Sequence, residues 1–202
     1  MNFLSWLRAM RWQLSYSKAG NQPQIDLYSG NERGTSRYDS DRSSPMASAA
    51  SAANILLAAA EERGLALDPM KLQKLLFLAN GYYLAMTGEP WIEESFQTWE
   101  YGPVIPSIYR YFRRFGSSAI ERGTRIRTLF SPPPTPAAND ELDTALNYVL
   151  DTYGSKRAVY LSELTHQIGS PWHKIWSEEG KNRPIPNKNI REYYSHLVTN
   201  QN

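Results

Sequence analysis

The residues whose types and spacing suit metal chemistry are few, and they lie in the last quarter of the chain. Glu163 and His166 have the spacing that places a carboxylate and an imidazole on one face of a helix. Glu192 and His196 offer a second pair. A site of this kind needs two Glu-x-x-His motifs and further carboxylates, and a Gly-Ser-Pro segment separates His173 from His166. We therefore expect no metal site, and we interpret His166 as a hydrogen-bonded packing residue.

The sequence has none of the other common catalytic patterns. It contains no glycine-rich phosphate loop, no nucleophile elbow and no paired acids in an apolar setting. Its 202 residues include no cysteine, which excludes a thiolate nucleophile, a disulfide framework and every sulfur-ligated zinc site. We predict that the protein is not an enzyme, needs no cofactor and works in a reducing cytoplasm.

Arginine is the residue type that indicates a binding surface. Residues 46–202 carry sixteen basic and sixteen acidic residues, so their bulk charge does not indicate a nucleic-acid partner. Six arginines nevertheless gather within 18 residues, with only Glu121 opposing them. They are Arg110, Arg113, Arg114, Arg122, Arg125 and Arg127. Because arginine pairs carboxylates bidentately and complementary charge raises association rates, this cluster is expected to steer an acidic protein partner. A solvated helix face is the alternative.

Aromatic residues near the arginines are candidate interface anchors, of the type that dominates binding energy. Tyr101, Tyr109, Tyr111 and Trp91 lie within reach along the chain, and core packing is the alternative for each of them. The predicted partner-contacting residues are Tyr109, Arg110, Arg113, Arg114, Arg125 and Arg127.

A central helix over residues 68–88 must position these groups. Its apolar residues recur at steps of three and four, and Asp68, Pro69 and Gly88 supply an N-cap, a first helical position and a left-handed end. The polar residues of the helix lie off or beside the apolar stripe, which predicts a helix buried on one side and open on the other. These residues are Lys71, Gln73, Lys74 and Asn80.

Periodicity and punctuation predict the other elements. Helices are expected over residues 48–63, 103–115, 142–153 and 160–167, after the Ser-Pro-Trp restart at 170–172, and over 187–198. Residues 94–99 and 124–130 are predicted to pair as two strands. The expected fold class is mainly α, a compact bundle of six to seven helices with one small two-stranded β element.

The first 45 residues are expected to lie outside the domain of residues 46–202. Most of this extension is rich in Gly, Asn, Ser, Asp and Arg and has no period, which predicts disorder. Met46 as the true start of the protein, a partner-binding tail and membrane contact by a short amphipathic helix are the alternatives. No apolar run approaches the roughly 18 residues that cross a bilayer, so we expect a soluble protein without a membrane partner.

Residues 153–176 have the proportions of a helix-turn-helix, with Gly169 in the turn. The helix after the turn offers only Lys174 as a basic contact, and Glu178 and Glu179 would repel phosphates. Binding of operator DNA therefore remains an alternative function.

Several short motifs, taken together and in this order, resemble the Panacea domain, a family that includes SocA antitoxin-like and phage-associated GepA-like proteins. The resemblance covers roughly residues 50–178. The motif residues are Lys71, Gln73, Lys74, Trp99, Tyr101, Gly102, Pro103, Thr165, His166, Pro171 and Trp172.

The resemblance implies a mostly helical antitoxin that neutralises a cognate protein toxin by direct contact. Toxins of this family are diverse and include alarmone-synthetase-like enzymes, and some relatives present the toxin to a cytoplasmic AAA+ protease. We expect the motif residues to lock the central helix against the Tyr-Gly-Pro turn, with direct toxin contact as the alternative. The arginine-bearing third helix and the loop after it are then the expected toxin-binding surface.

Overall fold

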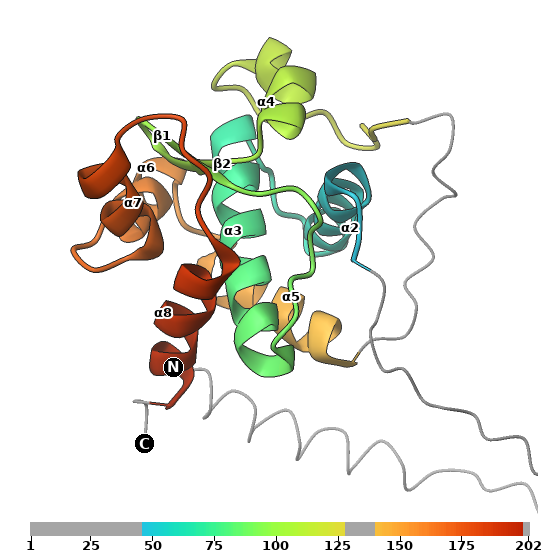
Figure 1. The fold of residues 1–202 in the computed structure, drawn as a ribbon. Helices are drawn as coiled ribbons and strands as arrows, with labels where there is room; N and C mark the ends of the chain where they lie inside the picture. Colours follow the sequence, from blue (N-terminus) through green and yellow to red (C-terminus); the bar gives the residue numbers. More distant parts are fainter. Residues whose placement is uncertain (1–45, 128–139, 200–202) are drawn as a thin grey trace, which may run out of the picture.

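The structure is a computed structural model and describes residues 46–127 and 140–199. Within these ranges the chain forms seven α-helices, one short 3-10 helix and a two-stranded sheet, which confirms the predicted fold class (Figure 1). The helices are α2 (Ala49–Glu62), α3 (Pro69–Thr87), α4 (Pro106–Phe112), α5 (Asp140–Tyr153), α6 (Ala158–Thr165), α7 (Pro171–Glu179) and α8 (Asn187–Thr199). The 3-10 helix η1 (Arg113–Phe115) continues α4, and the strands are β1 (Gln97–Trp99) and β2 (Gly102–Val104).

Two predictions fall outside this part of the chain. The extension of residues 1–45 and the last residues of the predicted second strand, 128–130, lie outside the described residues. Among the described helices, none combines the length and apolar character that crossing a bilayer requires.

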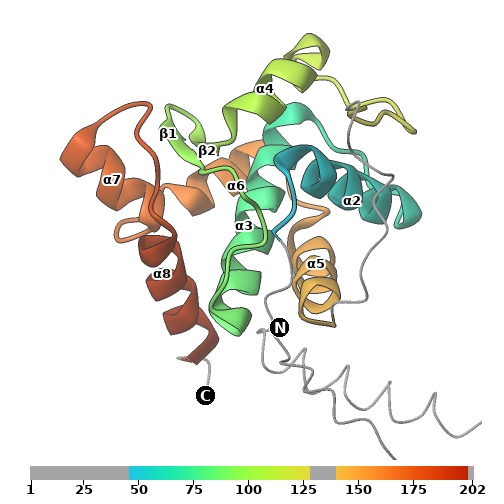
Figure 2. The same cartoon turned by 45° about the vertical axis from the view of Figure 1, so that its right-hand side comes forward.

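Helix α3 runs through the middle of the molecule, as the sequence predicts. The Asp68 side chain accepts a hydrogen bond from the Lys71 amide (2.9 Å), Pro69 occupies the first turn, and Gly88 ends the helix at φ +84°. In Figures 1 and 2, α2 and α5 lie on one side of α3, α6, α7 and α8 lie on the other, and α4 crosses its N-terminal end. The core therefore forms around one helix.

The predicted open side of α3 is wrong. Lys71, Gln73, Lys74 and Asn80 are 8%, 3%, 1% and 1% exposed. Loops and the β-hairpin cover this side of the helix, and the polar side chains bond to their backbone; Asn80 Oδ1, for example, accepts from the amides of Trp91 (3.0 Å) and Ile92 (3.1 Å). A polar helix edge can thus be buried because each of its four side chains forms at least one hydrogen bond with the backbone that covers it.

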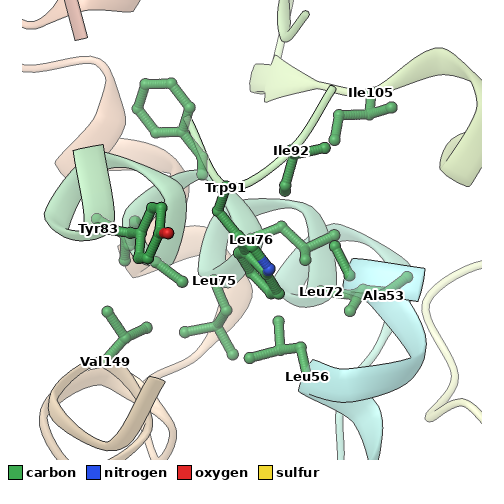
Figure 3. Packing of buried hydrophobic residues seen from close by; sticks show 14 of the residues in the cluster. Ala53, Leu56, Leu72, Leu75, Leu76, Tyr83, Trp91, Ile92, Ile105 and Val149 are labelled. Carbon is green, nitrogen blue, oxygen red and sulfur yellow. The ribbon is translucent and has the colours of Figure 1, made fainter. Parts of the chain in front are cut away.

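The buried surface of α3 packs against α2, α5 and α8. Figure 3 shows Leu72 of α3 beside Ala53 of α2, and Leu75 of α3 between Leu56 of α2 and Val149 of α5. Alanine on the α2 face permits close helix approach, and each fully buried leucine contributes about 1.5–3 kcal/mol by leaving water.

Helix α8 approaches α3 at a glycine. A Cβ on Gly81 would lie 2.4 Å from the ring of Tyr194, so only glycine allows this ring to reach the helix backbone. Tyr194 also packs edge-on against Phe77 and Tyr82, with ring centroids 6.0 and 5.1 Å apart. The C-terminal helix is therefore part of the core.

The predicted pairing of residues 94–99 with 124–130 is wrong. Strand β1 instead pairs antiparallel with β2, with Thr98 opposite Pro103, and residues 124–127 are irregular. Asn54 of α2 holds that irregular segment through both hydrogen-bonding groups of the Ile126 backbone (2.8 and 2.9 Å). A tight turn at Glu100 and Tyr101 makes the local pairing geometrically cheaper than a distant one.

The predicted third helix is shorter than expected at its start. It begins at Pro106, and its buried residues are Ile108 and Phe112. Tyr109, a predicted partner-contacting residue for which core packing was the alternative, is 39% exposed. The arginine-bearing helix therefore presents an aromatic ring as well as charge at the surface.

Candidate protein-binding site

Gln73 holds the segment that leads into α4. Its side-chain amide donates to the Ile105 carbonyl (3.2 Å) and its side-chain oxygen accepts from the Ile105 amide (2.9 Å). Ile105 is fully buried and comes immediately before α4, so this double hydrogen bond sets where the helix starts.

Lys74 lies under the turn between the two strands. Its ammonium group donates to the Pro103 carbonyl (3.1 Å), and no ion pair joins it to a carboxylate in the described ranges. The side chain is 1% exposed, and burial lowers the pKa of Lys74 from 10.5 to about 7. Burying an ammonium group without a carboxylate lowers the free energy of unfolding. Lys74 therefore destabilises the fold while it fixes the position of the turn.

Helices α6 and α7 hold the other side of the motif turn, the name used here for residues 99–103. The Trp172 indole donates to the Trp99 carbonyl (3.0 Å), and His166 Nε2 donates to the Glu100 carbonyl (3.1 Å). The Ser162 hydroxyl donates to the Tyr101 carbonyl (2.9 Å). With Lys74, these contacts bind four of the five carbonyls of the motif turn from three different helices.

Gly102 is where the motif turn comes closest to the helices beneath it. A Cβ at this position would lie 2.6 Å from Thr165 Oγ1 and 2.9 Å from Lys74 Cε, and the residue has a φ of +101°. Thr165 in turn donates to the Ser162 carbonyl (2.8 Å). Glycine is therefore needed both for the backbone conformation and for the close contact.

The structure brings together every predicted motif residue except Lys71. Pro171 opens α7, where the Ser170 hydroxyl caps the helix and also donates to the Thr165 carbonyl (2.8 Å). Lys71 does not reach the turn. Its ammonium group donates to the Ala66 carbonyl (3.4 Å) in the segment before α3, and burial lowers its pKa.

A surface groove lies between the motif turn, the start of α3 and the α4–η1 segment. We call it the turn groove; its volume is about 440 Å³. Its lining residues are Pro69, Met70, Gln73, Lys74, Trp99, Glu100, Tyr101, Val104, Tyr109, Arg113 and Gly116. The groove therefore combines motif residues with two of the predicted partner-contacting residues.

Two exposed tyrosines flank the turn groove. Tyr101 is 67% exposed at the tip of the motif turn, and the Tyr109 ring packs edge-on against Trp99 with centroids 4.8 Å apart. Of the other candidate anchors, Tyr111 is 37% exposed and Trp91 only 4%, so Trp91 belongs to the core.

The arginines divide into two groups. Arg110, Arg113 and Arg114 are exposed, and among the described residues none of them forms an ion pair. Arg114 lies over the ring of Phe115, 4.9 Å from its centroid, and Arg113 lines the turn groove. We call these three residues the arginine face.

Arg125 differs from the arginine face. Its guanidinium forms two hydrogen bonds of 2.9 Å to the carboxylate of Glu61, and this pairing lowers the pKa of Glu61 from 4.5 to about 2. Arg127 is exposed at the edge of the described segment. The structure thus joins the loop after η1 to α2 through Arg125.

Two other groups singled out from the sequence do not come together as sites. Among the described His, Asp and Glu side chains, no group of three is placed to hold a metal ion. In α7, Lys174, Glu178 and Glu179 are exposed on the same short helix.

Two buried polar residues in this region were missed by sequence reasoning. Ser162 and Thr98 both bond to distant backbone, and Thr98 joins β1 to residues 180–183 (2.7 Å to the Gly180 carbonyl). In the sequence these residues appear only as a serine or threonine next to motif residues, and this pattern does not identify the backbone group to which the hydroxyl bonds.

Comparison with known proteins identifies one protein family and one individual relative. A family model described as antitoxin SocA-like, Panacea domain, matches residues 72–173. Antitoxin SocA of Caulobacter vibrioides (strain NA1000 / CB15N) is 31% identical over 137 residues, which span 64% of this chain and 71% of the relative. No solved structure matches the chain.

Proposed function

Because the chain belongs to the family of SocA-like antitoxins with a Panacea domain, we propose that it neutralises a cognate protein toxin by binding it directly. The toxin would be held non-covalently, so no residue of this chain has to react. The proposed place of action is the cytoplasm, where the toxin is made.

The arginine face carries this proposal. Arg110, Arg113 and Arg114 remain exposed without acidic partners in the described structure, while the backbone beside them is held from three helices. A rigid support reduces the backbone freedom that is lost on binding, and the planar guanidinium loses less rotamer freedom per hydrogen bond to a carboxylate than a lysine does. An acidic toxin surface fits them best.

The structure offers less support for operator DNA as the main partner. The exposed residues of α7 include two acids for one lysine, which opposes contact with phosphates. An alarmone-synthetase-like toxin and delivery to an AAA+ protease remain predictions from the family resemblance.

Growth measurements test the proposed function. The protein encoded by the adjacent gene is expressed alone and together with the full chain, and we expect it to arrest growth alone and to be tolerated in the pair. The two proteins should also co-purify as a complex. An adjacent product that is harmless, or that stays toxic and unbound beside this chain, would refute the proposal.

A further inference from the structure

The turn groove is the described cavity at which the motif turn and the arginine face meet. Met70 and Val104 supply apolar lining, Trp99 and Tyr109 pack against each other along the groove, and Arg113 is exposed beside them. A volume of about 440 Å³ lies in the range of sites that take one small ligand or a few side chains. It is too small for a folded domain.

Charge along the groove is unbalanced. Its acid, Glu100, is paired with Lys181 at 3.4 Å, so its charge is partly offset. Arg113 has no ion pair within the described ranges, and the Lys74 ammonium lies buried beneath the groove, where it donates to the Pro103 carbonyl. The groove therefore favours an occupant that brings negative charge or hydrogen-bond acceptors.

The aromatic rings add a second requirement. Tyr101 is 67% exposed, and its hydrogen bond to α6 is made by its backbone carbonyl. Its ring is therefore not required for this contact. Rings of this kind bury large apolar area at low entropic cost when a partner side chain packs between them. The occupant should thus carry an apolar side chain as well as an acid.

We propose that the turn groove binds a short acidic segment of the toxin, with an apolar side chain between Tyr101 and Tyr109 and a neighbouring carboxylate on Arg113. This inference rests on the proposed antitoxin function and identifies where and by what chemistry the toxin is recognised. The motif turn then has two roles, because its carbonyls hold it to the helices while its side chains form one wall of the groove.

Titration of the full chain with the purified product of the adjacent gene tests the groove. Tyr101→Ala removes the ring and Arg113→Glu reverses the charge, and both leave the backbone hydrogen bonds of the motif turn in place. Each should raise the Kd roughly tenfold or more. Arg110→Glu, on α4 but outside the groove lining, should raise it less, mainly by slowing association.

Matched controls lie away from the groove. Tyr160→Ala removes a ring that is 46% exposed on α6. Arg191→Glu reverses an exposed charge on α8 beside Gly88, at the opposite end of α3 from the turn groove. Both should leave the Kd within about twofold. Urea denaturation of each variant checks that it is folded.

The outcomes separate the groove from the function. If the wild-type chain binds and Tyr101→Ala and Arg113→Glu bind equally well, the groove proposal is wrong while the antitoxin function stands. If the wild-type chain does not bind, the proposed function itself fails. A Tyr101→Ala variant with normal affinity beside weakened Arg110→Glu and Arg113→Glu would replace the groove with a diffuse charged surface.

The toxin segment can be located with overlapping peptides of the adjacent gene product. A peptide that combines acidic and apolar residues should bind the wild-type chain and lose at least tenfold in affinity for Arg113→Glu. Single-stranded DNA of matched charge should not displace it. Displacement by DNA, or binding only of basic peptides, would overturn the proposal.

Discussion

The motif turn and the arginine face lie next to each other, yet their side chains are used in opposite ways. At the motif turn, four side chains on or next to α3, α6 and α7 donate to four backbone carbonyls, and three of them, Lys74, Ser162 and Trp172, are buried. On the arginine face, Arg110 and Arg113 reach water and pair with no acid in the described structure. The residues that resemble the family motif therefore mainly build the support, and the residues beside them are available to a partner.

Disrupting the motif turn should have the largest effect. Gly102→Ala places a methyl group 2.6 Å from Thr165 Oγ1 at a φ of +101°, so we expect the free energy of unfolding to fall by about 2–4 kcal/mol. Urea denaturation measures this loss, and toxin binding should weaken with it.

Gly116→Ala is the matched control for this substitution. Gly116 also has a positive φ (+56°, with ψ −120°), but a Cβ there meets nothing within 4 Å, so only backbone strain of about 1–3 kcal/mol is expected, without the added cost of a close contact. Equal losses for the two variants would show that close packing under Gly102 does not hold the turn.

Lys74 should make stability depend on pH. Its pKa falls from 10.5 in the unfolded chain to about 7 in the folded protein, so between these values the unfolded chain binds the additional proton. The free energy of unfolding should therefore rise with pH in this window, by about 2 kcal/mol from pH 7 to pH 9.

Lys74→Met is the control for the pH effect, because methionine has a similar length and no charge. Denaturation at pH 7 and pH 9 should give nearly equal stabilities for this variant. A wild-type protein that shows no gain over the same interval would mean that the ammonium is not buried as described.

Reversing charge on the arginine face should act on binding and leave the fold intact. Arg113→Glu combined with Arg114→Glu changes two exposed side chains, so stability should fall by at most about 1 kcal/mol, the value of the Arg114 contact with Phe115. Toxin affinity should fall at least tenfold and growth protection should weaken. If this variant rescued growth as well as the wild-type chain, the arginine face would not be part of the toxin-binding surface.

Arg125→Gln should have the smallest effect. It tests whether Arg125 contributes to stability through Glu61, whereas the arginine face contributes to binding. The Glu61 pair is partly exposed, so we expect a loss of at most about 1 kcal/mol and nearly unchanged toxin affinity. The pair stabilises the protein above the ordinary Glu pKa of 4.5, and this contribution fades as pH falls toward about 2. The variant should lack that acid dependence; a large loss of toxin affinity would place Arg125 in the binding surface instead.

Local signals explain why the helices could be predicted. Asp68 and Pro69 start α3, Gly88 ends it, and Ser170 with Pro171 starts α7, all within one helical turn of the boundary they determine. Such signals depend on neighbouring residues, so one sequence is enough to read them.

The support for the site could not be predicted because its partners are far apart along the chain. Lys74 bonds 29 residues away at Pro103, and His166 bonds 66 residues away at Glu100. A polar edge on α3 has the same sequence pattern whether it meets water or backbone carbonyls. The partner of β1 was missed for a different reason: it lies only two residues beyond β1, and Gly102 and Pro103 have the sequence pattern of a turn although they form β2.

Hydrogen–deuterium exchange of the full chain, with and without the adjacent gene product, tests the central claim most directly. The account predicts that binding protects backbone amides over residues 99–116, which contain the motif turn and the arginine face, and leaves α7 and α8 unchanged. Protection concentrated in α7 or α8, with residues 99–116 exchanging as in the free protein, would contradict it.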